Sequence, residues 1–198
     1  MEQSIYKEDV YNTIPKKTIN YILNNLKTDI DGIHGINHWM RVLANLVIIH
    51  DNLSIDLQVA IAFSFLHDAF RINDFDDIEH GERVEKWFKN NKKISKKINL
   101  TERQKEVLFF ACSWHSQGKT ISLFNEIKHN FNEFEINTIV SCWDADRLDL
   151  ARAGILPNDR YLSTDVAKIK TIQMLCNKHA IGNKLYDFYE ELKFDLNI

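Results

Sequence analysis

Hydrophobic residues recur along most of this chain at intervals of three and four positions, which is the spacing of amphipathic helices. The segment IDLQVAIAFSFL, which begins at Ile55, is instead apolar on nearly every side, as is typical of a helix in the middle of a domain. The pattern therefore predicts helices over about 15–27, 36–50, 55–70, 79–91, 101–115 and 135–153, with one or two more between 163 and 192.

Residues that start and stop helices fall at the ends of these segments. Thr101 and Gln104 have the spacing of a capping box, and Ser54 can cap the helix that follows it. Pro15 stands early in a first turn, whereas Gly118 and Gly154 follow predicted helix ends. The boundaries thus agree with the hydrophobic pattern.

Glycine and proline are scarce, with six and two copies in 198 residues. A sheet-rich fold needs a turn roughly every 8–12 residues, and this chain lacks the turn residues. We therefore expect an all-α fold, a bundle of seven or eight helices forming a single domain over residues 1–198. Its motif-bearing core is expected over about 30–165, with C-terminal helices over 163–194 packed on it.

Charge and cysteine content narrow the functional classes. The chain has 25 Lys and Arg against 28 Asp and Glu, and a net charge of −3 gives no electrostatic case for binding nucleic acid or a membrane surface. The chain contains no run of 18 apolar residues, so the sequence predicts no membrane span, and the polar N-terminus has no signal-peptide pattern. The separated Cys112, Cys142 and Cys176 are typical of core thiols in a reducing compartment. We expect a cytoplasmic protein, and a homodimer remains open.

Several histidine and aspartate side chains fall where the helical pattern places core residues. His38 lies on the apolar face of the 36–50 helix, His67–Asp68 interrupts an apolar run, and His115 flanks another apolar stripe. Burial of such polar groups requires a partner or a metal. Any one of these histidines is most simply a hydrogen-bonded core residue, but the set together suits zinc, iron or manganese, without thiolate ligands.

Three aspartates compete within the 135–153 segment. At about 100° per residue, Asp146 lies roughly 60° from the core direction, Asp144 roughly 100°, and Asp149 further still. Asp146 is therefore predicted to lie nearest the core. A second His–Asp pair, at His50–Asp51, is excluded because His50 would lie about 18 Å from His38 along one helix.

The order His38, His67–Asp68, Asp146 resembles the HD domain of metal-dependent phosphohydrolases. The closer resemblance is to a bacterial HD subgroup, and it is carried by HGINHWMRV (34–42), FLHDAFRINDFDDIEHG (65–81) and CWDADRLDLARAGILP (142–157). It implies an all-α fold in which the four residues hold a divalent metal, with one or two ions of Mn, Fe, Zn, Ni, Co or Mg.

The resemblance also implies roles for neighbouring residues. Related guanosine-polyphosphate hydrolases and the dNTP triphosphohydrolase place the last ligand directly before a basic residue, as in Asp146–Arg147. Dinuclear HD proteins insert two histidines before that ligand, which here are His80 and His115; otherwise these two face the substrate or form ordinary hydrogen bonds. We expect His34 and Asp144 to lie just behind the ligands.

Some HD hydrolases carry a catalytic acid three or four residues after the His–Asp pair. Here those positions hold Phe70 and Arg71, so that acid is absent. Arg71 lies one turn from His67 and can bind a phosphate oxygen. Alternatively, it pairs with Asp74 or Asp77.

These features predict a metal-dependent phosphohydrolase, a phosphomonoesterase or phosphodiesterase, acting on a nucleotide or another small phosphate ester. Asp68 would position a metal-activated water, Arg71 and Arg147 would bind phosphoryl oxygens, and His115 or His80 would protonate the leaving group. Two alternatives remain open. One is a mixed-valent diiron oxygenase of the HD type that uses all six ligands, and the other is a non-catalytic HD protein that senses a ligand.

Overall fold

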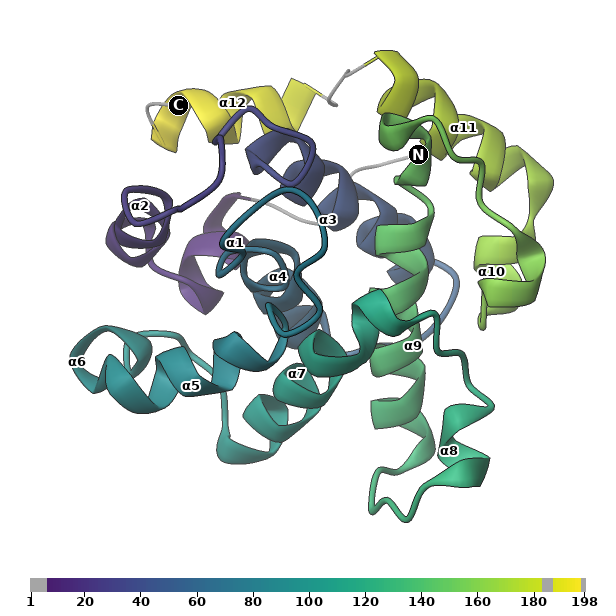
Figure 1. Ribbon diagram of the computed structural model, residues 1–198, viewed down its shortest axis with the longest axis horizontal. Helices are drawn as coiled ribbons and strands as arrows, with labels where there is room; N and C mark the ends of the chain where they lie inside the picture. Colours follow the sequence, from purple (N-terminus) through teal and green to yellow (C-terminus); the bar gives the residue numbers. More distant parts are fainter. Residues whose placement is uncertain (1–6, 183–186, 197–198) are drawn as a thin grey trace.

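The computed structural model describes residues 7–182 and 187–196, and within them every regular element is a helix (Figure 1). The α-helices are α1 (Lys7–Thr13), α2 (Lys16–Leu23), α3 (Ile36–His50), α4 (Leu57–Leu66), α5 (Glu82–Asn90), α6 (Lys92–Ser95), α7 (Glu102–Trp114), α8 (Leu123–Glu126), α9 (Glu133–Arg147), α10 (Asp165–Lys168), α11 (Lys170–Gly182) and α12 (Asp187–Leu196). Three short 3₁₀ turns are η1 (His115–Gln117), η2 (Leu150–Ala153) and η3 (Asp159–Tyr161).

Helix α4 lies in the middle of the fold, in contact with α1, α3, α7 and α9 (Figure 1). Every residue from Val59 to Leu66 is buried, which explains why its sequence is apolar all round. The side chain of Asp56 caps this helix by accepting a hydrogen bond from Val59 N. Helix α9 also packs on both α3 and α7, so one hydrophobic core holds α3, α4, α7 and α9 together.

Shorter helices cover the outside of this core. Helix α5 packs on α7, and α11 packs on α3 and η2. Helix α12 lies against α2. It also reaches α3, where Lys193 Nζ donates to Asn37 Oδ1 at 2.6 Å. Tyr11 donates to Asp195 at 2.5 Å, which ties the last described helix to the first.

The all-α class is confirmed, and the 36–50 helix has the predicted bounds. The capping box at Thr101 is also confirmed, with both of its hydrogen bonds present. The central helix is shorter than predicted because Asp56, rather than Ser54, caps it and the helical part ends at Leu66. The described residues hold twelve α-helices rather than seven or eight, since the terminal segments divide into several helices and the short helices α6 and α8 form within connecting segments.

The three cysteines are buried and free of disulfides. Among the residues described, no helix combines the length and apolar character that crossing a bilayer demands. The single-domain organisation and the association of its C-terminal helices with a core over 30–165 stay predictions, as does the homodimer.

Candidate metal centre

Four histidines from four parts of the chain converge in the core with their Nε2 atoms facing one another. His38 on α3 and His67 at the end of α4 bring these atoms to 3.0 Å. His80, just before α5, and His115, at the start of η1, bring theirs to 2.9 Å. All four side chains are at most 4% exposed. The sequence-predicted histidines thus form two close pairs.

Asp68 lies between the two pairs and places one carboxylate oxygen on each. Its Oδ2 is 3.5 Å from Nε2 of both His38 and His67. Its Oδ1 is 3.0 Å from Nε2 of His80 and 3.6 Å from Nε2 of His115. One buried carboxylate therefore joins all four imidazoles.

Asp146, near the end of α9, completes the cluster from the opposite side. Its Oδ1 lies 3.3 Å from His38 Nε2. Two sets of three side chains each bring one potential ligand atom to within 4.8 Å of the others. We name them the His38 half (His38, His67, Asp146) and the His80 half (Asp68, His80, His115).

The second nitrogen of each histidine is engaged by an acceptor, which fixes the ring. Nδ1 of His67 donates to the Phe63 carbonyl at 3.0 Å, and Nδ1 of His115 donates to the Cys112 carbonyl at 2.6 Å. Nδ1 of His80 donates to the carbonyl of Asp77. With the proton held on Nδ1, the Nε2 lone pair of a neutral ring points into the cluster, which is the form that binds a metal.

The titratable groups of the cluster are shifted in different directions. Burial acts to lower the pKa of His38, but hydrogen bonds with carboxylates, chiefly Asp146 and Asp149, raise it to about 9. Burial lowers the pKa of His67 to about 3, so that this ring is neutral. Burial acts to raise the pKa of Asp68, yet the surrounding imidazoles hold it well below its ordinary value. An ionised Asp68 beside the neutral ring of His67 fits a divalent metal, and His38 must release a proton to ligate one.

The order of burial predicted for the three aspartates is wrong. Asp144 and Asp149 are 0% and 1% exposed, whereas the side chain of Asp146 is 15% exposed. Helical phase fails for Asp149 because α9 ends at Arg147 and the chain then turns, which brings Asp149 inward. Asp146 nevertheless is the aspartate of this segment that faces His38 Nε2.

The residues expected just behind the ligands have other partners. Asp144 accepts hydrogen bonds from Ser163 N at 2.9 Å and Thr164 N at 2.7 Å, so it anchors the start of α10. His34 Nδ1 lies 3.0 Å from Asp74, and the two rings of His34 and His38 meet edge to face. Neither Asp144 nor the Nδ1 atom of His34 hydrogen-bonds a ligand nitrogen, because each is paired with a residue outside the cluster.

Asp149, which helical phase predicted to lie furthest from the core, is buried directly behind His38. Its Oδ2 accepts from His38 Nδ1 at 2.7 Å, and its Oδ1 accepts from Arg41 Nε at 2.7 Å. Arg152 adds a contact at 3.7 Å and also lies 3.8 Å from Asp146. The signal for Asp149 in the sequence is the group of three aspartates in DADRLD, the last of which lies beyond the end of α9.

Arg71 contacts the cluster and the main chain of residues 73–75, but neither Asp74 nor Asp77 through its guanidinium. Its Nη1 lies 3.4 Å from Asp68 Oδ1, and its other nitrogens donate to main-chain carbonyls of Asn73 and Phe75. The salt bridge to Asp74 or Asp77 considered from sequence is replaced by other pairings, since Asp74 contacts His34 and Asp77 contacts Arg83.

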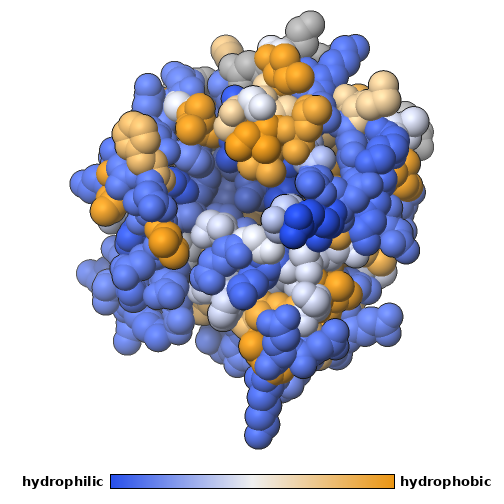
Figure 2. Space-filling view, turned by 45° about the vertical axis from the view of Figure 1, so that its right-hand side comes forward, coloured by the Kyte–Doolittle hydropathy of each residue, from blue (hydrophilic) through white to orange (hydrophobic). Residues whose placement is uncertain are grey.

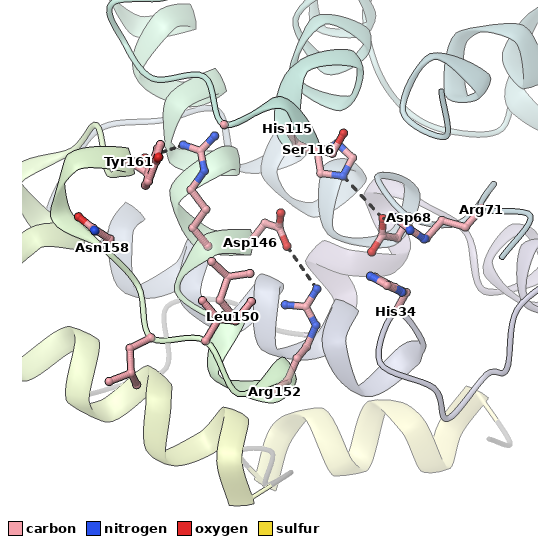
Figure 3. Close-up of a pocket in the computed structure, with 14 residues that line it drawn as sticks. His34, Asp68, Arg71, His115, Ser116, Asp146, Leu150, Arg152, Asn158 and Tyr161 are labelled. Carbon is pink, nitrogen blue, oxygen red and sulfur yellow. Dashed lines mark hydrogen bonds and ion pairs between the residues drawn. The ribbon is translucent and has the colours of Figure 1, made fainter. Parts of the chain in front are cut away.

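A cavity of about 530 Å³ opens beside the cluster. Figure 3 shows Asp68, Arg71, His34 and His115 at one end, and Asn158 and Tyr161 at the other. Between them lie Asp146, Leu150 and Arg152. Ile155 and Leu156 also line the cavity. The face formed around α9 to α11 is hollowed, with hydrophobic side chains gathered along one margin (Figure 2).

Arg147 also lines this cavity. Its Nη1 donates to the Tyr161 carbonyl at 2.7 Å. Its Nη2 is buried with no hydrogen-bond partner among the described residues. Burial lowers its pKa, although Asp144 and Asp146 act against this. A third arginine beside the cavity, Arg152, was not predicted from sequence.

Comparison with known proteins finds no matching family model, no matching curated protein and no matching solved structure.

Proposed function

We propose that this protein is a metal-dependent phosphohydrolase of the HD type with a two-ion centre. The observation that carries the proposal is the position of Asp68, whose two oxygens divide four inward-facing histidine nitrogens into two pairs. A bridging carboxylate flanked by imidazoles is the arrangement that holds two ions a few ångströms apart. The order of the HD motifs along the chain supports the same assignment.

The ligand set fits divalent metals of the first transition series. Four imidazoles and two carboxylates, without thiolate, suit Mn, Fe, Co, Ni or Zn, and Mg less well because it prefers oxygen. When bound, such an ion would supply a Lewis acid that polarises the phosphoryl group and lowers the pKa of a bound water.

The chain's own residues bind and orient the phosphate. Arg71 and Arg152 reach the cavity from opposite sides of the cluster, and Arg147 lines it further out. Guanidinium groups bind phosphoryl oxygens through paired hydrogen bonds and stabilise the charge that develops on them. His115 lies on the cavity wall, but as a ligand of the second ion it has no proton to transfer, so the general-acid role expected for it applies only to a one-ion centre.

The cavity accommodates an organic group beside the phosphate. Leu150, Ile155, Leu156 and Tyr161 form an apolar wall away from the cluster, and its volume of about 530 Å³ is typical of sites for small organic molecules. We therefore propose a nucleotide or another small phosphate ester as substrate, with a phosphomonoester or phosphodiester bond as the one cleaved.

The test is metal analysis and phosphate release on the full chain. Anaerobically purified protein should carry up to two transition-metal ions per chain and release phosphate from members of a nucleotide and phosphate-ester panel. Asp68→Ala should lose both properties. Asp51→Ala, at the exposed aspartate of the His50–Asp51 pair that ends α3, is the matched control and should keep both. Full hydrolysis by a metal-free Asp68→Ala protein would refute the proposal.

The same six ligands also fit a diiron oxygenase, and this second candidate is favoured by the close approach of both histidine pairs. It requires two irons per chain and oxygen consumption with an organic substrate. Hydrolysis with manganese in the absence of oxygen would count against it.

A further inference from the structure

The two halves of the centre differ in what stands behind one histidine, since Nδ1 of His67 in the His38 half donates to a main-chain carbonyl as the histidines of the His80 half do. In the His38 half, Nδ1 of His38 donates to a carboxylate, Asp149 Oδ2, at 2.7 Å. In the His80 half, Nδ1 of His80 and Nδ1 of His115 donate to the main-chain carbonyls of Asp77 and Cys112. A carboxylate behind a ligating histidine increases its basicity, and its removal typically costs about 10–100-fold in metal affinity.

Asp149 is held rigidly in this position. Arg41 donates to both of its oxygens, at 2.7 and 3.1 Å, and Arg152 Nη1 donates to its main-chain carbonyl at 3.1 Å. Asp149 is 1% exposed and Arg41 is 5% exposed. A buried carboxylate with fixed donors stays oriented toward the ring it supports, so His38 is aligned for an ion in advance.

The His80 half has a cation closer to its ligand atoms than the His38 half, where Arg152 Nη2 lies 3.8 Å from Asp146 Oδ1. Arg71 Nη1 lies 3.4 Å from Asp68 Oδ1, and 3.3 and 3.4 Å from Nδ1 and Nε2 of His80. Hydrogen bonds to the carbonyls of Asn73 and Phe75 hold the guanidinium there. An ion in this half needs the same carboxylate oxygen and the same imidazole, and it meets a like charge at close range.

We propose that the two halves bind metal with unequal affinity, with Asp149 strengthening the His38 half and Arg71 weakening the His80 half. This inference rests on the metal centre of the proposed function and adds two positioning residues to it. Its consequence is sequential loading, in which the His38 half fills first. The second ion then displaces the Arg71 guanidinium from Asp68, so that occupancy of the His80 half follows the metal supply.

The test is a calorimetric titration of the chelator-stripped full chain with MnCl₂ and no substrate. Wild type should show two binding events that differ at least tenfold in Kd. Asp149→Asn retains an oxygen for His38 Nδ1 but loses the charge, and it should weaken the tight event about 10–100-fold while leaving the weak one unchanged. Arg71→Gln should tighten the weak event severalfold and leave the tight one unchanged.

Asp51→Asn and Arg160→Gln, both exposed, are matched controls and should titrate as wild type. Two events of equal affinity in wild type would overturn the inference, as would an Asp149→Asn protein weakened equally in both events or an Arg71→Gln protein with an unchanged or weaker second event. Thermal melting verifies folding, and if Asp149→Asn does not fold, wild type and Arg71→Gln still decide.

The same titration separates this inference from the proposed function. Unequal binding events in a protein that releases no phosphate from any ester would refute the hydrolase and leave the inference standing. Hydrolysis by a protein whose two ions bind equally would refute the inference alone. A chain that binds no metal would refute both.

Discussion

Gly81 packs with its α-carbon against the main-chain carbonyl of Cys112, so closely that any β-carbon at this position would overlap the carbonyl group. The same carbonyl accepts the hydrogen bond from His115 Nδ1 at 2.6 Å, and His80 immediately precedes the glycine. The approach of these two main-chain segments therefore brings His80 and His115 to 2.9 Å.

Gly81→Ala should remove the second ion. Its methyl group must push the start of α5 away from α7, which separates His80 from His115. We expect the metal content after loading with manganese to fall from two ions to one per chain, together with a lower melting temperature. Gly118→Ala is the control: it has open space at its β-carbon but a φ of +64°, so it should cost about 1–2 kcal/mol without changing metal content. Two retained ions in Gly81→Ala would contradict the expectation.

Helical phase explains why much of this site can be predicted from sequence. His38 lies on an unbroken apolar face, so a period of 3.6 residues places it in the core, and its short connection to the next helix brings His67 beside it. The order of motifs added His80 and His115 by resemblance. These assignments depend on the spacing of apolar residues and on motif order, both of which are present in a single sequence.

The parts that were missed depend on where helices stop and on contacts distant in sequence. Asp149 was placed away from the core because the helix was extended past Arg147, where the chain turns. In the sequence, Gly81 is only the last residue of the 65–81 motif, because its contact with Cys112 exists only in the folded chain. Asp144 was expected near the ligands, whereas its partners lie 19 and 20 residues further along.

Asp144→Ala should lower stability without lowering metal content. The carboxylate accepts from the amides of Ser163 and Thr164 and from the Thr164 hydroxyl, and its loss leaves buried donors unpaired. Leaving a buried donor unpaired costs about 1–3 kcal/mol, and each kcal/mol corresponds to about 2–4 °C in a chain of this size. Differential scanning calorimetry with parallel elemental analysis measures both. Asp144→Asn keeps one oxygen acceptor and should lose less. Metal loss at an unchanged melting temperature would contradict the structural role.

Glu135 and Arg103 provide a pH-dependent contribution far from the centre. Arg103 donates to both oxygens of Glu135 at 2.6 and 2.7 Å, and this hydrogen bonding holds the pKa of Glu135 below its ordinary value of 4.5. A carboxyl with a lowered folded pKa stabilises the fold above its unfolded pKa, and that stability is lost as pH falls through the folded pKa.

Glu135→Gln should therefore be less stable than wild type at pH 7, and the difference should shrink toward pH 3. The glutamine side chain can still accept from Asn132 N in the capping box, while it loses the charge and one of the two oxygens that accept from Arg103. Urea unfolding at both pH values measures the difference, with Glu133→Gln in the same helical turn as control. A difference that stays constant from pH 7 to pH 3 would show that the charge is not its source.

Loading with manganese should raise the melting temperature of wild type. The ion would pair with the buried, ionised Asp68 and with the lone pairs of the neighbouring imidazoles, whereas the unfolded chain would bind it only weakly. A ligand at 100 times its Kd stabilises a fold by about 2.7 kcal/mol. Asp68→Asn removes the bridging charge, so its melting temperature should respond little to the ion, while Asp51→Asn should respond as wild type. A chelator should reverse the wild-type shift. An equal response of Asp68→Asn would place the stabilising ion elsewhere on the chain and contradict the centre described above.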